Sequence, residues 1–240
     1  MDEKITILSV FHSPESKKLL ELNFDLVKKL NPEADYEWVI ADNTSKISPP
    51  YEEGVPQTVV GGVGVKIISG IPKAPDNVPD WIKPSFPHNI AMNMSVSHIQ
   101  TRFAVFLDSD FYVLQKDWIK KAIEHMKKNN LTFLGTPWHP KGYRVFRYFP
   151  CHQCFFVDFY KLDEAGYKKE DLDFTPLEYE KAPQKPPGRN FGKLSRLVNI
   201  FNFKERKMIG QEKHTAHRIF EKFSFDPKLR FEVIPAVFKP

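Results

Sequence analysis

The sequence has few cysteines and no long apolar run, and each shortage excludes a class of protein. Only two of its 240 residues are cysteines, too few for a disulfide framework. No segment approaches the roughly 18 consecutive apolar residues of a membrane-spanning helix. The opening stretch MDEKITILSV also lacks the basic segment and cleavage site of a signal peptide. We therefore expect a cytoplasmic protein without a disulfide scaffold.

The net charge is also small, because 35 basic residues are nearly balanced by 30 acidic ones. The formal net charge is +5, which suits an anionic partner such as a nucleotide, a phosphorylated lipid or a membrane surface, but is also common on ordinary solvated surfaces. With 41% hydrophobic residues, a chain of this length fits one large α/β domain.

Apolar runs alternate with helical patterns in the first half of the chain. Ile5–Ser13 reads as a strand that ends in polar residues, Pro14 opens a helical pattern, and Tyr36–Ser45 reads as a second strand. Such a unit predicts parallel strands joined by a crossover helix. The segment Ile47–Pro87 is irregular but contains a further strand in VVGGVGVKII. His88–Gln100 has the spacing of an amphipathic helix.

The next run, FAVFLDSDFYVL, is a buried strand interrupted by two carboxylates, Asp108 and Asp110. Ligands of open α/β sheets bind beyond the carboxyl ends of the strands. Residues two apart on an extended segment project the same way, so both carboxylates can approach one divalent cation. The alternative is that one aspartate caps the following turn and the other is solvated.

Three stretches in this order, ITILSVFHS, WVIADNTS and HNIAMNMSVSHIQTRFAVFLDSDFYV, resemble the nucleotide-sugar-dependent glycosyltransferases of the GT-A fold, within them the inverting group called family two. The resemblance covers roughly the first half of the chain. It implies a single GT-A domain over residues 1–240, a mostly parallel sheet flanked by helices. Residues 1–114 would be the nucleotide-binding half and residues 115–240 the acceptor-binding half.

The resemblance also implies site residues. The nucleotide-sugar site would be formed by Phe11, His12, Ser13, Asp42, Asn89 and Asp108. The ligands of Mn²⁺ or Mg²⁺ would be Asp108, Asp110 and a histidine of the second half, His214, with His217 as its alternative.

An inverting transfer needs a base for the acceptor hydroxyl. In the family this is a carboxylate within an acidic pair, followed by an arginine. Glu212 occupies that position and Arg218 that of the arginine, but Gln211 replaces one acid of the pair. The alternative bases are Asp173, Glu178 and Glu180.

The second half carries three further features. Four aromatic residues suit stacking on an acceptor sugar, although aromatic residues are also common in cores: Trp138, His139, Tyr143 and Tyr148. Arg144 and Arg147 could instead grip a phosphate. Cys151 and Cys154 would need His139 and His152 to complete a zinc site, so we expect reduced cysteines lining a strand. The Pro-rich basic loop at about 171–207 could be a lid, a contact with an anionic membrane, or a solvated insertion.

We thus predict a metal-dependent glycosyltransferase that moves a sugar from a nucleotide-diphosphate donor to a hydroxyl of a glycan, lipid-linked sugar or protein. A nucleotidyltransferase is an alternative, but SVFHSPES is neither glycine-rich nor basic. A second alternative is a non-enzymatic basic module that binds an anionic polymer, with steep salt dependence and no need for Asp108 or Asp110. We expect no nucleic-acid partner.

Overall fold

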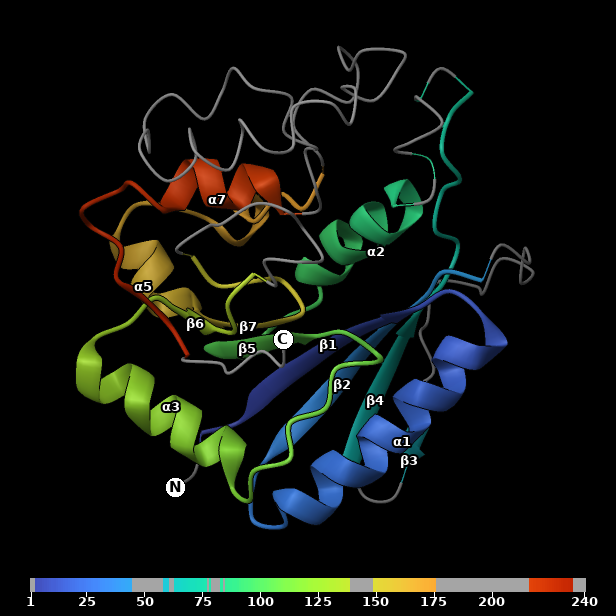
Figure 1. Ribbon diagram of the computed structural model, residues 1–240, viewed down its shortest axis with the longest axis horizontal. Helices are drawn as coiled ribbons and strands as arrows, with labels where there is room; N and C mark the ends of the chain where they lie inside the picture. Colours follow the sequence, from blue (N-terminus) through green and yellow to red (C-terminus); the bar gives the residue numbers. More distant parts are fainter. Residues whose placement is uncertain are drawn as a thin grey trace, which may run out of the picture.

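The computed structural model describes residues 3–44, 58–60, 63–76, 78, 83, 85–138, 149–175 and 216–234. Within them, one eight-stranded sheet has the order β3-β4-β2-β1-β5-β7-β6-β8, with helices on both faces (Figure 1). The strands are β1 Ile5–Phe11, β2 Tyr36–Asp42, β3 Thr58–Val60, β4 Val63–Ile68, β5 Phe103–Leu107, β6 Phe133–Gly135, β7 Cys154–Asp158 and β8 Phe231–Val233. The helices are α1 Pro14–Leu30, α2 Phe86–Val96, α3 Trp118–Asn129, α5 Phe159–Glu164, the short 3₁₀ helix η1 Lys169–Asp171 and α7 His217–Phe223.

The sheet is mostly parallel. Strand β1 pairs in parallel with both β2 and β5, β2 with β4, and β6 with β8. The strands β3 and β7 run antiparallel to their neighbours. This arrangement confirms the predicted α/β fold class, a mostly parallel sheet flanked by helices, including the β1-α1-β2 crossover unit and a strand within residues 47–87.

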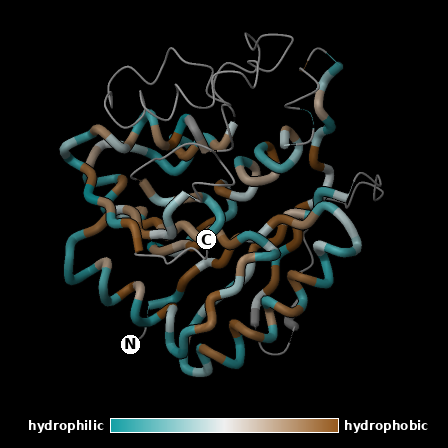
Figure 2. Tube along the Cα trace, viewed as in Figure 1, coloured by the Kyte–Doolittle hydropathy of each residue, from teal (hydrophilic) through white to brown (hydrophobic). Residues whose placement is uncertain are grey.

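The centre of the sheet is covered on both faces. Every residue of β1 is buried, and its side chains alternate between two hydrophobic clusters. Ile5 and Ile7 pack with α1 and α3, whereas Leu8 and Val10 pack with α2, α5 and α7. Figure 2 shows the same layering, with brown strands inside and teal residues outside on the helices. A central strand buried on both faces is typical of a parallel sheet.

Local sequence determines where the helices begin. Ser13 and Ser16 form a capping box at the start of α1, followed by Pro14 and by Glu15 in the first turn, all of which favour a helix N-terminus. The helix α2 begins at Phe86 and ends at Val96, so the predicted bounds, His88–Gln100, were wrong at both ends. Pro87 in the first turn is compatible with a helix start. No helix among the described residues is long and apolar enough to cross a membrane.

Candidate functional site

The two aspartates of the D-x-D motif lie directly beyond β5, at the carboxyl edge of the parallel strands. Ser109 between them is buried, Asp110 is exposed and Asp108 is partly buried. The backbone N–H of Phe111 donates to the carbonyl of Asp108 (3.0 Å), and the N–H of Asp108 donates to the carbonyl of Gln153 (2.9 Å). A closed turn, fastened to the residue before β7, therefore carries both carboxylates.

The surroundings of Asp108 change how readily its carboxyl group ionises. Burial, and after it the proximity of Asp110, raise the pKa of Asp108 to about 7, while a hydrogen bond from Gln153 opposes the rise. Ionising both groups without a counter-ion is thus unfavourable. A divalent cation between them would remove the repulsion.

Histidines surround this turn. Burial and the neighbouring His12 lower the pKa of His88 to about 4, while Asp110 opposes the change. His88 is therefore neutral at pH 7. Its ring lies 6.5 Å from that of His152, which lies 5.5 Å from the Trp138 ring. The structure thus brings His12, at the end of β1, and His88, on α2, to the D-x-D turn.

The predicted nucleotide residues lie at the same edge of the sheet. Phe11 ends β1 opposite Asp42, the last residue of β2. The Phe11 ring is buried in the hydrophobic cluster of α1 and α3, and His12 is exposed. The Ser13 hydroxyl accepts from the Ser16 N–H (3.2 Å) and so caps α1. Asp42 Oδ1 accepts from the N–H and the hydroxyl of Thr44 (2.9 and 2.6 Å).

Asn89, in the first turn of α2, has a buried side-chain amide. Its exposed fraction is 0%, and neither its Nδ2 nor its Oδ1 has a hydrogen-bond partner in the described part of the chain. A buried amide left unpaired costs about 1–3 kcal/mol. Such a group fits a site that takes up a polar ligand or a water molecule.

Among the alternative bases, Asp173 lies in the described region and has other partners. It accepts from Asn93 on α2 (3.0 Å) and from Arg218 on α7 (2.6 Å), as well as from Thr175. Burial favours a higher pKa for Asp173, but these hydrogen bonds together hold its pKa below the usual value. A carboxylate so engaged is a weak base, which counts against this alternative.

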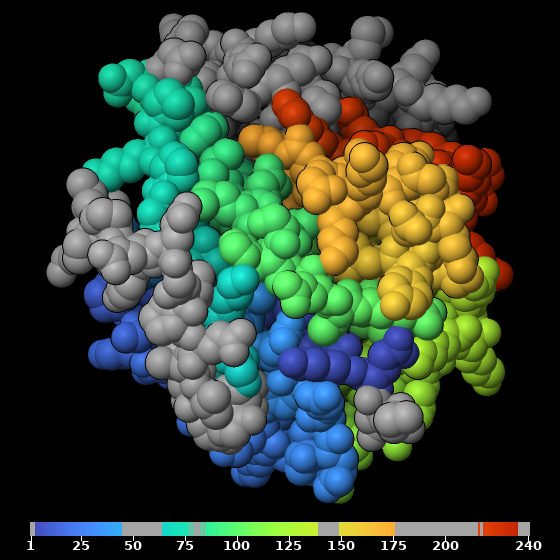
Figure 3. Space-filling view, turned by 180° about the vertical axis from the view of Figure 1, so that it is seen from behind, coloured from blue at the N-terminus to red at the C-terminus, as the bar shows by residue number. Residues whose placement is uncertain are grey.

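Through the contacts of Asp173, helix α2 is joined to α7 and to the segment that precedes α7 in the described chain. Seen from behind, the green residues around α2 lie beside the yellow segment that carries α5 (Figure 3). The N–H of Ala216 donates to the carbonyl of Phe174 (3.1 Å), and Lys222 pairs with Asp171 (2.6 Å). These contacts hold both ends of α7 next to residues 171–175.

Several predicted site residues lie outside the described residues. These are Glu212, Gln211, His214, Glu178, Glu180, His139, Tyr143, Arg144, Arg147, Tyr148 and most of the basic loop at 171–207. The backbone of His217 lies in α7, but its side chain is not described.

The two cysteines are buried and form no disulfide; we predicted that both line a strand, but only Cys154 lies in one. Cys154 opens β7 beside Leu107. Burial, followed by the neighbouring Cys151 and Asp108, raises the pKa of Cys154 to about 12. Its thiol is therefore protonated at neutral pH. Trp138, a candidate for the acceptor site, is buried.

The donor set suits a hard divalent ion shared with a phosphate. No three His, Cys, Asp or Glu side chains among the described residues form a group that could hold a metal ion alone. Mg²⁺ and similar ions are commonly held by one or two carboxylates together with substrate phosphates and water. Asp108 and Asp110 fit that pattern, because they supply two carboxylates at an open edge.

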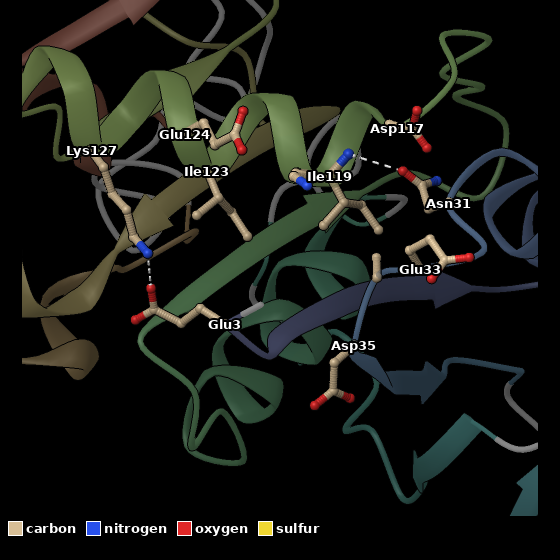
Figure 4. Close-up of a pocket in the computed structure, with 11 residues that line it drawn as sticks. Glu3, Asn31, Glu33, Asp35, Asp117, Ile119, Ile123, Glu124 and Lys127 are labelled. Carbon is tan, nitrogen blue, oxygen red and sulfur yellow. Dashed lines mark hydrogen bonds and ion pairs between the residues drawn. The ribbon is translucent and has the colours of Figure 1, made fainter. Parts of the chain in front are cut away.

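A separate cavity of about 160 Å³ lies at the opposite end of the strands. It is lined by Glu3, which precedes β1, by Asp35, which precedes β2, and by residues of α3 (Figure 4). Asn31 Oδ1 accepts from the N–H of Ile119 (3.0 Å) at its wall. None of the predicted site residues lines this cavity.

Two residues at the D-x-D turn were missed by the sequence analysis. The side-chain Nδ2 of Asn23, on α1, donates to the carbonyl of Phe111 (2.9 Å). Gln153 contacts Asp108 through both its backbone and its side chain. A signal existed for Asn23, because it interrupts the apolar stripe of α1. No local signal exists for Gln153.

No family model matches the sequence, and no curated protein matches it. Solved structures do match. The mannosyltransferase PcManGT of Pyrobaculum calidifontis, in complex with GDP-Man and Mn²⁺, is 14% identical with a TM-score of 0.48, and the match covers 92% of this chain and 69% of that one. S. aureus TarS 1–349 is 13% identical with a TM-score of 0.46, covering 79% of this chain and 53% of that one. The same TarS fragment in complex with UDP-GlcNAc is 13% identical with a TM-score of 0.45, covering 85% and 68%.

This chain thus spans about half of the first TarS structure. At such identities and TM-scores the likeness assigns this chain no donor, acceptor or metal. The bound GDP-Man, UDP-GlcNAc and Mn²⁺ belong to those proteins.

Proposed function

We propose that this protein is a metal-dependent glycosyltransferase that moves a sugar from a nucleotide-diphosphate donor to an acceptor hydroxyl, with inversion. One observation carries the proposal. The turn directly beyond β5 places two carboxylates, those of Asp108 and Asp110, at the carboxyl edge of a mostly parallel sheet, where ligands of such sheets bind. Carboxylates in that position serve a diphosphate only together with a cation.

Each residue of this edge has a role in the proposal. Asp108 and Asp110 would hold Mn²⁺ or Mg²⁺, which when bound stabilises negative charge on the departing diphosphate. His12 and the loop at Ser13 would line the nucleotide together with Asp42. The buried, unpaired amide of Asn89 would receive a polar group of the donor or a bridging water. Glu212 stays our prediction for the base that takes the proton of the acceptor hydroxyl. His214 stays our prediction for a further ligand of the metal.

The test is the binding of nucleotides in the presence and absence of metal. Thermal unfolding would be followed with GDP, UDP and their sugars, each with Mn²⁺, Mg²⁺ or a chelator, because a ligand of the native state raises the melting temperature. GDP and UDP come first, since PcManGT and TarS were solved with GDP-Man and UDP-GlcNAc.

The variant that tests the site is Asp110→Asn. We expect it to lose the metal-dependent shift and to keep the melting temperature of the wild type without ligand, because Asp110 is exposed. Asp163→Asn, an exposed aspartate of α5, is the matched control and should keep the shift. A shift that survives in Asp110→Asn would contradict the metal assignment.

A further inference from the structure

Asn23 is a polar residue at a core position of α1. The buried side of this helix is formed by Ser16, Leu20, Asn23 and Val27, and the exposed fraction of Asn23 is 1%. An amphipathic helix normally has an apolar residue there. A buried amide is tolerated where it has hydrogen-bond partners, so those partners show what it stabilises.

The described partners of its amide nitrogen lie in the D-x-D turn. Asn23 Nδ2 donates to the carbonyl of Phe111 at 2.9 Å and to that of Asp108 at 3.4 Å. The Phe111 N–H closes the same turn onto the Asp108 carbonyl. One side chain of α1 therefore fastens both ends of the turn that contains Asp108 and Asp110.

The turn lies outside the regular pairing of the sheet. Strand β5 ends at Leu107, and neither a helix nor a strand includes residues 108–117. The described backbone contacts of this segment include the bond from Asp108 N–H to the Gln153 carbonyl and the bond from Asp117 N–H to the carbonyl of Leu30 (2.7 Å). Between these two points, the buried amide of Asn23 fastens the turn to α1, and the side chains of Phe111 and Val113 pack against the adjoining hydrophobic cluster.

We infer that Asn23 is a positioning residue, which holds the turn so that the Asp108 and Asp110 carboxylates face one cation. This inference rests on the proposed function, and it adds a residue to the metal site without adding a ligand. Partners that orient metal ligands typically contribute about 10–100-fold to metal affinity. Loss of the Asn23 amide should therefore reduce the affinity for the metal ion more than it reduces the stability of the fold.

The experiment compares two buried asparagines: Asn23, within α1, and Asn31, which caps the end of that helix. In Asn23→Leu the branching at Cγ is kept and the amide is lost. The control is Asn31→Leu: Asn31 is 2% exposed, donates to the Val27 carbonyl (2.9 Å), and lies at the opposite end of the strands. Mn²⁺ affinity would be measured by electron paramagnetic resonance, with GDP or UDP present, alongside the melting temperature of each variant.

We expect Asn23→Leu to lose at least about tenfold in Mn²⁺ affinity, whereas Asn31→Leu keeps the wild-type affinity at a similar loss of melting temperature. Asn23→His, whose ring N–H can donate from nearly the same place, should recover part of the affinity. If Asn23→Leu fails to fold, Asn23→Ala leaves room for water and takes its place.

Two other outcomes are distinguishable. A wild type that binds Mn²⁺ with nucleotide, and an Asn23→Leu that binds it equally well, would overturn the inference and leave the proposed function standing. A wild type that binds no Mn²⁺ with either nucleotide would overturn the proposed function, and the inference with it.

Discussion

The carboxyl group of Asp108 experiences opposing influences. Burial and the charge of Asp110 favour its protonated form, while the hydrogen bond from Gln153 favours the ionised form, and the resulting pKa is about 7. Without a cation, Asp108 is thus partly protonated at neutral pH. A divalent ion would displace that proton, because metal ligands must be deprotonated. Metal binding should therefore tighten as the pH rises through 7.

The same shift predicts how stability depends on pH in the absence of metal. The pKa of Asp108 is raised from 3.8 to about 7 on folding, so the folded state binds more protons than the unfolded state between these values. The free energy of unfolding must then fall as the pH rises through this range. Asp108→Asn cannot ionise, and we expect its melting temperature to exceed that of the wild type increasingly from pH 5 to pH 8. The scale is roughly 2–4 °C for each kcal/mol in a chain of this size.

The measurement is a series of thermal unfolding curves in chelator at each pH, with Asp163→Asn as the control for loss of a surface charge. Parallel pH profiles for Asp108→Asn and the wild type would contradict the raised pKa.

At the scale of single residues, the sequence predicted those whose role depends on local spacing. Asp108 and Asp110 follow a strand directly, so their place at the sheet edge could be derived from the pattern. Asn23 could not be linked to them, because its partners lie 85 and 88 residues further along the chain. The buried ring of Phe11 was missed for the same reason, since α1 and α3 cover it only in the folded protein.

At the scale of elements, Gly135 of β6 lies tightly against β7. A Cβ added there would lie 2.4 Å from the carbonyl oxygen of Cys154 and 2.9 Å from the Cβ of Pro150. Both neighbours are parts of the backbone or close to it, so they cannot rotate away. Strand β7 also follows Gln153, whose carbonyl holds Asp108.

Gly135→Ala is therefore expected to push β7 away from β6 and to lower the free energy of unfolding by roughly 1–3 kcal/mol, as overpacking typically does. The matched control is Gly64→Ala in β4, where the nearest atom, the Glu37 Cβ, would be 4.0 Å away. Urea unfolding of both variants is the measurement. Equal stabilities for the two would contradict the close approach at Gly135.

The elements of the first half were easier to predict than those of the second. Strands β1, β2 and β5 are five to seven residues long and show clear apolar runs. Strands β6 and β8 have three residues each, too few for a recognisable pattern. Their pairing depends on contacts between distant parts of the chain, such as β6 with β8, which no local pattern reveals.

At the scale of the whole molecule, the net charge is +5, and several of the described lysines are paired with acidic side chains. Lys127 pairs with Glu3, Lys4 with Glu37 (2.7 Å), and Lys222 with Asp171 (2.6 Å). Opposite charges alternate at these places. A polyanion, which needs many neighbouring cations, therefore suits the described surface less well than a small diphosphate at the D-x-D turn.

Salt dependence separates these two ligands. Proteins that contact 6–10 phosphates of a nucleic acid lose roughly 10³–10⁵-fold in affinity between 50 and 200 mM salt. A nucleoside diphosphate bound through a cation contacts few charges, so we expect its affinity in Mn²⁺ to fall less than about tenfold over that range. Fluorescence anisotropy with labelled GDP or UDP and with a labelled DNA duplex would measure both. Tight, steeply salt-dependent binding of the duplex that is unchanged in Asp110→Asn would instead identify a polyanion-binding module, because such binding has no use for the carboxylate pair.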